Sequence, residues 1–174
     1  QLARAAKNEP HAVLTDLTLK EGFDRFVYYE CINGQNIEEI AKTPYSIVAS
    51  DSYPTGNPRY FKNSIIHPRT FGTFPEFLRT FVYSKHLLGL PEAIRKITST
   101  PASRFGIKGR GYLVKDACAD VTIFDPEALE SRADIGNPCE YPKGIRHVIV
   151  NGEVVVESGE YTGKLPGVVL RKNS

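Results

Sequence analysis

An aspartate at the end of an apolar segment is the residue of this sequence best placed to do chemistry. Asp51 follows residues 46–49 (SIVA), which read as a short buried strand, and it opens a long polar loop. In α/β barrels, active sites lie at the C-terminal ends of the strands. A carboxylate there can hold a water molecule and move its proton, or can bind a metal ion. The alternative is that Asp51 only caps the loop that follows it.

The histidines and cysteines form no pattern that predicts a metal site. We expect His11 and His86 on helix faces and His147 in a strand, each in a structural role. The three cysteines are an odd number without a CxxC motif, which argues against a disulfide framework and against a closed zinc site. This pattern favours a reducing compartment, so we expect a cytoplasmic location. We expect packing roles for all three: Cys31, Cys118 and Cys139.

The elements that must position Asp51 alternate between strand and helix. Residues 25–29 (RFVYY) and residues 46–49 have the composition of short strands. Between them, residues 33–42 place Ile37, Ile40 and Ala41 on one helical face. Both strands are continuous apolar runs, which is typical of parallel strands covered on both faces. The order predicts a β-α-β unit of an α/β fold.

Further helices flank this unit. Residues 11–20 are weakly helical up to Gly22, and the opening residues read as a helix already under way, so we expect a fragment of a longer chain. Apolar residues at positions 74, 77, 78, 81 and 82 predict an amphipathic helix. Pro91 opens the next helix at a position where its missing N–H costs little. A last short helix begins near Pro101 and ends at Gly106.

The pattern changes to strand after a turn at residues 109–111. Residues 121–124 read as a strand, and residues 148–150 and 154–156 are apolar triplets that flank Asn151-Gly152. Asn-Gly is the preferred sequence of a type I′ hairpin turn. We therefore divide the chain into an α/β part at residues 1–108 and a small β module at residues 109–174.

The composition excludes several classes of protein. The 174 residues are 41% hydrophobic and 24% charged, which is ordinary for a globular domain. The net charge is +2 with both signs interspersed, so we expect no nucleic-acid partner. No apolar run is long enough to cross a bilayer, so we expect no membrane partner either.

Several motifs resemble one enzyme family. Ser50-Asp51, the HPR of residues 67–69 and the TFGTFP of residues 70–75 are similar to the SDG, HPR and GTFPR motifs of the N-acyl-D-amino-acid deacylases. These enzymes form the D-aminoacylase branch of the metal-dependent amidohydrolase superfamily. The resemblance covers residues 40–171. Its later pieces follow in the same order at residues 90–107, 109–126, 137–163 and 166–171.

The resemblance implies a fold, a metal and a reaction. The chain would supply the last strands and helices of a (β/α)₈ barrel followed by a small β-sandwich module, as the C-terminal part of the enzyme. The enzyme would hydrolyse the amide bond of N-acyl-D-amino acids with a divalent metal, usually Zn²⁺. Most metal ligands would precede Gln1, so we expect the isolated chain to be inactive. Its partners would be the N-terminal remainder of the barrel and the small-molecule substrate, and the exposed barrel surface favours oligomers.

The resemblance also assigns residues. Asp51 matches the aspartate that orients and deprotonates the metal-bound water, with direct metal binding as the alternative. Arg69 would bind the substrate carboxylate, because a guanidinium suits bidentate contact; the alternative is a loop arginine that pairs with a nearby acid. His67 and Ser50 are candidates for substrate contact, with packing of the loop as the alternative for His67, and Tyr53 and Arg59 are further candidates in the same loop. The family glycine after the aspartate is Ser52 here, which leaves the substrate details of the loop open.

Two other functions compete with this hypothesis. The first is a related amidohydrolase that acts on cyclic amides and needs no carboxylate clamp. The second is a non-catalytic binding protein that keeps the amidohydrolase fold but has lost its metal ligands. An HxH motif upstream of this sequence would favour an enzyme.

Overall fold

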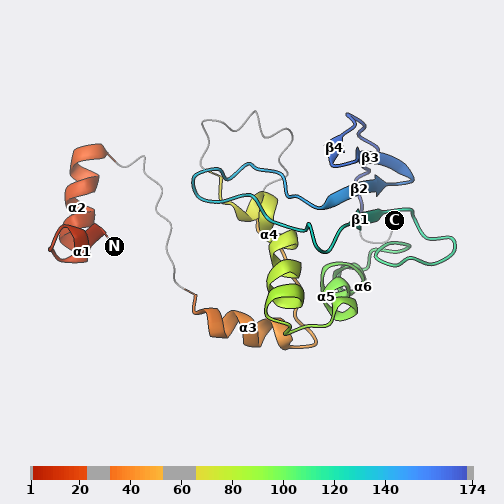
Figure 1. The fold of residues 1–174 in the computed structure, drawn as a ribbon, viewed down its shortest axis with the longest axis horizontal. Helices are drawn as coiled ribbons and strands as arrows, with labels where there is room; N and C mark the ends of the chain where they lie inside the picture. Colours follow the sequence, from red (N-terminus) through yellow and green to blue (C-terminus); the bar gives the residue numbers. More distant parts are fainter. Residues whose placement is uncertain (1, 23–31, 53–65, 172–174) are drawn as a thin grey trace. The chain divides into compact units, whose positions relative to one another are not determined.

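The computed structural model describes residues 2–22, 32–52 and 66–171, and the chain divides into two compact units, Gln1–Asn33 and Gly34–Ser174 (Figure 1). The first unit contains α1 (Leu2–Ala5) and α2 (Pro10–Glu21). Gly22 ends α2 with a φ of 82°, which glycine adopts readily, and its N–H donates to the Thr18 carbonyl at 2.9 Å. The predicted helix and its stop are confirmed. The strand predicted at residues 25–29, and Cys31, lie outside the described residues.

The second unit begins with helices that the sequence predicts in outline. Gly106 ends the last of them in the left-handed conformation, with a φ of 70°. The helix predicted near residues 74–82 is longer than expected, because it begins at Arg69 and continues as a π-helix to Ser84. His86 lies beyond that end, exposed and with a φ of 52°, so its predicted place on a helix face is wrong. The helices are α3 (Gly34–Lys42), α4 (Arg69–Leu78), η2 (Arg79–Ser84), α5 (Leu90–Ile97) and α6 (Ser99–Phe105).

The second half of this unit forms an antiparallel sheet with the order β1-β2-β3-β4. Val148 pairs with Val156 across the predicted hairpin, and Asn151 and Gly152 have φ values of 49° and 81°, as a type I′ turn requires. The hairpin prediction is confirmed. The described residues form this single layer and do not show the second layer of a sandwich. The strands are β1 (Val121–Phe124), β2 (Ile145–Val150), β3 (Glu153–Glu157) and β4 (Glu160–Tyr161).

The strand predicted at residues 46–49 is not formed. In the described part of the chain, no strand pairs with this segment, and the N–H of Val48 donates instead to the carbonyl of Lys96 in α5 at 3.4 Å. A strand exists only through its ladder of hydrogen bonds to a neighbour, and the local apolar pattern cannot supply that neighbour. The predicted parallel β-α-β unit is therefore absent from the described residues.

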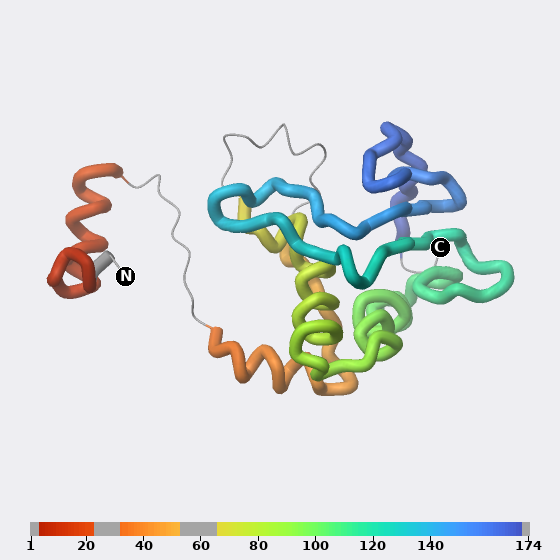
Figure 2. Tube along the Cα trace, viewed as in Figure 1, coloured from red at the N-terminus to blue at the C-terminus, as the bar shows by residue number. Residues whose placement is uncertain are grey.

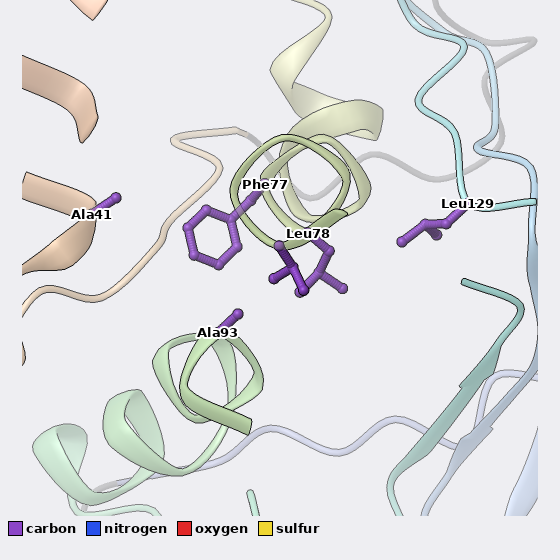
Figure 3. Close-up of a cluster of buried hydrophobic side chains, with 6 residues drawn as sticks. Ala41, Phe77, Leu78, Ala93 and Leu129 are labelled. Carbon is purple, nitrogen blue, oxygen red and sulfur yellow. The ribbon is translucent and has the colours of Figure 1, made fainter. Parts of the chain in front are cut away.

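The core of the second unit is built around α4 and η2. Figure 3 shows Ala41 of α3, Ala93 of α5 and Leu129 directed toward Phe77 and Leu78 of α4. These side chains, together with Val82, are less than a tenth exposed. The apolar faces predicted for α4 and α5 meet in this cluster, whereas α3 contributes Ala41 alone, because Ile37 and Ile40 of its predicted face are exposed. Among the described residues, no helix combines the length and the apolar character that a membrane span needs.

The connection between β1 and β2 braces the start of α4. Figure 2 shows this connection leaving the sheet, passing α4 and returning. Its Tyr141 packs edge-on against Phe71, with 5.6 Å between the ring centroids. Gly72 faces Ser131 so closely that an added Cβ would lie 2.4 Å from the Ser131 Oγ. The β module therefore fixes the helix turn that carries Arg69.

Candidate active site

Asp51 and Arg69 lie against each other although 17 residues separate them in sequence. The Arg69 Nη2 is 2.8 Å from the Asp51 Oδ2, and the Arg69 Nε donates to the Asp51 main-chain carbonyl at 3.1 Å. The Asp51 side chain is 82% exposed and the Arg69 side chain 46%. An exposed ion pair of this kind contributes at most about 1 kcal/mol to stability. Another carboxylate can therefore replace that of Asp51 on Arg69 at little cost.

Backbone geometry directs these two side chains toward each other. Arg69 is the first residue of α4, and the hydroxyl of Thr73 donates to its carbonyl at 2.7 Å. Asp51 has a φ of 48°, in the left-handed region that non-glycine residues seldom adopt. Backbone outliers of this kind persist where surrounding contacts hold them, and they concentrate at functional sites. The outlier supports Asp51 as the centre of the site.

His67 adjoins the pair through the main chain. Its Nδ1 accepts the N–H of Arg69 at 3.1 Å, so this nitrogen carries no proton in the structure. Partial removal of the ring from water, and secondarily the Arg69 charge, lower the pKa of His67 below its usual value of 6.5. At neutral pH His67 is thus a neutral ring that fixes the turn into α4.

Ser50 is next to Asp51 but turns to another partner. Its hydroxyl shares a hydrogen bond of 3.0 Å with the hydroxyl of Ser52. Ser52, which stands where the family motif has glycine, thus interacts with Ser50. Tyr53 and Arg59 lie outside the described residues.

A hollow of about 600 Å³ opens beside the pair. Its walls come from α3, from residues 46–49, and from the facing side of α4 and η2, and Arg69 lies on its lining. Ile37 and Ile40 of α3, which also line it, are exposed. The hollow is therefore an apolar space that this part of the chain leaves uncovered.

The described residues do not form a zinc site. A structural or catalytic zinc ion needs three or four protein ligands at about 2.0–2.3 Å. In residues 2–22, 32–52 and 66–171, no three histidine, cysteine or acidic side chains converge for metal binding. Asp51 is a single carboxylate paired with Arg69, so the described residues do not hold a metal ion by themselves. The other histidines and cysteines stand apart: His147 lies in β2 as predicted, whereas Cys118 is exposed and is not the packing residue expected.

One buried charge was missed by the sequence analysis. Lys96 of α5 is fully buried, and its ammonium group contacts the turn after α3. A signal was present, because Lys96 follows Ala93 by three residues and so shares the apolar face of the helix. A lysine on an apolar helix face becomes buried when the helix packs, so its ammonium group needs hydrogen-bond acceptors in the interior.

Comparison with known proteins identifies the family. A sequence profile of the amidohydrolase family matches residues 66–156, and the chain belongs to this family. Within it, the similarity lies with the D-aminoacylase branch. The chain is 38% identical to the D-aminoacylase of Alcaligenes xylosoxydans xylosoxydans over 146 residues, which is 84% of this chain and 29% of that enzyme. It is 36% identical to the N-acyl-D-aspartate deacylase of the same organism over 143 residues, 82% of this chain and 27% of that enzyme.

Solved structures agree with the sequence comparison. A crystal structure of D-aminoacylase superposes with a TM-score of 0.69 and 30% identity, covering 76% of this chain and 27% of that one. An N-acyl-D-glutamate deacylase from Bordetella bronchiseptica, complexed with zinc and a phosphonate mimic of the tetrahedral intermediate, superposes with a TM-score of 0.64 and 33% identity, covering 71% and 25%. The chain therefore has an amidohydrolase-like arrangement of helices and antiparallel sheet, and it spans less than a third of the length of these relatives.

Proposed function

We propose that this chain forms the C-terminal part of a metal-dependent amidohydrolase that hydrolyses the amide bond of N-acyl-D-amino acids. The observation that carries the proposal is the contact between Asp51 and Arg69, 2.8 Å apart. It brings an acid–base group and a carboxylate-binding group to one place, and both are needed to hydrolyse an acylated amino acid. Membership of the amidohydrolase family and the likeness to D-aminoacid deacylases supply the reaction class.

Asp51 is the acid–base residue in this proposal. Its Oδ atom accepts a proton from the attacking water and passes it to the departing amide nitrogen. The zinc of the whole enzyme would make that water more acidic. The high exposure of the Asp51 side chain supports this role, because both water and substrate can reach it.

Arg69 binds the free carboxylate of the substrate. The Nη2 that holds the Asp51 Oδ2 is released when a substrate carboxylate arrives, while the Nε keeps the Asp51 main chain in place. Binding of substrate thus frees Asp51 to accept a proton. His67 and Ser50 complete the proposed substrate site, and the bond from Arg69 N–H to the His67 ring supports a role in orienting the clamp.

The remainder of the enzyme covers the hollow beside the pair. We assign residues 1–108 to the last strands and helices of a (β/α)₈ barrel and residues 109–174 to a small β-sandwich module. In this arrangement residues 46–49 become a strand once neighbouring barrel strands supply its ladder. The uncovered apolar hollow and the exposed Ile37 and Ile40 support such a partner. The free thiols of Cys118 and Cys139 fit the proposed cytoplasmic location.

Kinetics of the whole enzyme test the proposal. With an N-acetyl-D-amino acid as substrate, Asp51→Asn lowers kcat by about 10²–10⁴-fold, since the amide cannot accept a proton. Arg69→Lys raises KM more than it lowers kcat, because lysine keeps the positive charge but cannot bind the substrate carboxylate through two N–H groups as a guanidinium does.

A second arginine–aspartate pair provides the matched control. Arg146 Nη2 lies 2.7 Å from Asp125 Oδ2 in the β module, so Asp125→Asn and Arg146→Lys make the same chemical changes away from the site. Both controls keep kcat and KM near wild type. Near wild-type kcat in Asp51→Asn, with unchanged metal content, refutes the assignment of Asp51.

A further inference from the structure

Lys96 donates hydrogen bonds to the turn that follows α3. Its Nζ donates to the Thr43 carbonyl, to the Ser46 Oγ at 3.0 Å and to the Ser46 carbonyl at 3.4 Å. Within the described part of the second unit, Lys96 is the one charged side chain with an exposed fraction of 0%. An ammonium group taken out of water must place all three N–H groups on acceptors. Here the three hydrogen-bond acceptors belong to two residues of one turn, and the Glu92 carboxylate, 3.6 Å away, supplies the opposite charge.

The rest of α5 holds the same segment. The Arg95 Nη2 donates to the Pro44 carbonyl at 2.8 Å, and the carbonyl of Lys96 accepts the N–H of Val48. The main chain from residue 43 to residue 48 is thus attached to α5 by side-chain and main-chain bonds together. Since α5 also packs into the core through Ala93, the attachment is to a fixed element.

The held segment leads directly to Asp51. Asp51 follows Val48 by three residues and has the left-handed φ of 48°. On its other side, the Arg69 Nε holds its carbonyl oxygen. A left-handed non-glycine residue persists only where surrounding contacts hold it. Arg69 supplies one restraint, and the attachment of residues 43–48 to α5 supplies the other.

We infer that Lys96 is a positioning residue for Asp51, acting through the turn at residues 43–46. The inference about rate rests on the proposed function; the inference about position does not. A neutral side chain of similar length cannot replace Lys96, because it would remove the donor that ties the Thr43 and Ser46 oxygens to α5 and the positive charge beside the Glu92 carboxylate. The segment before Asp51 would then shift, and a displacement of about 1 Å at a catalytic group can cost about 10²-fold in rate.

A double-variant cycle in the whole enzyme tests the inference about rate. Lys96→Met lowers kcat for an N-acetyl-D-amino acid by at least about tenfold, and changes KM by less than about threefold. In an Asp51→Asn background, the same substitution lowers kcat by less than about twofold, because its effect passes through the Asp51 carboxylate. Equal losses in both backgrounds overturn the inference. Lys164→Met, which removes an exposed ammonium paired with Glu153 in the hairpin, is the control and leaves kcat unchanged.

Amide hydrogen exchange tests the position without reference to activity. In Lys96→Met the amide of Val48 exchanges at least about tenfold faster, while amides of α4 keep their wild-type rates. Unchanged exchange at Val48 overturns the inference. If the wild-type enzyme does not hydrolyse N-acyl-D-amino acids, the proposed function fails and this measurement still decides the positioning role.

A milder variant serves if Lys96→Met does not fold. Ser46→Ala removes one of the three acceptors and keeps the ammonium buried. It removes the hydrogen bonds of the Ser46 hydroxyl to Lys96 and to the Thr43 carbonyl, lowers kcat by about threefold, and this decrease also disappears in the Asp51→Asn background. Persistence of the loss in that background counts against the inference.

Discussion

Two glycines with nearly the same φ should respond very differently to an added methyl group. Gly144, just before β2, has a φ of 82°, and Gly152 in the hairpin turn has a φ of 81°. A Cβ at Gly144 would lie 2.7 Å from main-chain atoms of Ala128 and Leu129, whereas a Cβ at Gly152 would meet nothing within 4 Å. The main chain of residues 128–129 cannot rotate away as a side chain can. Relief of the overlap must therefore move Leu129, which is 4% exposed in the core.

The two substitutions thus separate conformational strain from overlap. Alanine is strained at the positive φ of both positions, and a left-handed alanine costs about 1–2 kcal/mol. Overpacking at Gly144 adds about 1–3 kcal/mol for Gly144→Ala alone. For a chain of this size, the difference separates the thermal unfolding midpoints of the two variants by at least about 2 °C. Differential scanning fluorimetry of the purified variants measures it. Coincident midpoints would refute the close packing of Gly144 on residues 128–129.

Three further outcomes follow from the structure. The hydrogen bond from Arg95 lowers the pKa of Glu92 from 4.5 to about 2. The ionised Glu92 therefore stabilises the fold fully above pH 4.5, and this stabilisation is lost as pH falls toward 2. Glu92→Gln should lower the urea midpoint of unfolding at pH 7 but not at pH 2. Gly72→Ala should lower the unfolding temperature in the wild type but not in a Ser131→Ala background, where the 2.4 Å overlap is gone. The purified 174-residue chain with added Zn²⁺ should not hydrolyse N-acyl-D-amino acids, and turnover by it would contradict the absence of a metal site from the described residues.

Elements whose signals are local were predictable from the sequence. The type I′ turn needs positive φ at two adjacent residues, and Asn151-Gly152 supplies that conformation without any help from distant contacts. The helices α3 and α5 were found for a similar reason, since their apolar residues repeat with the helical period. The two-residue strand β4 was missed because Glu160 and Tyr161 are too short a run to carry a pattern.

Elements that depend on distant partners were not predictable. Residues 46–49 have the composition of a buried strand, yet Val48 bonds to α5 because α5 is the neighbour that the described chain provides. The same limit applies to the site. The resemblance pointed to Asp51 and Arg69 separately, and only the folded chain showed that they contact each other. Lys96 was missed because its acceptors lie about 50 positions upstream in the turn at residues 43–46.

The order of strands in the sheet has a consequence for how the chain folds. Each strand pairs with its neighbour in sequence, so the contact order within the sheet is low. Closure of a loop costs about 0.6 kcal/mol more for each doubling of its length. The two-residue connection between β2 and β3 therefore closes before the connection at residues 125–144 that joins β1 to β2. We therefore expect the hairpin to form before β1 docks, so that the connection bracing the Arg69 turn of α4 is completed after it.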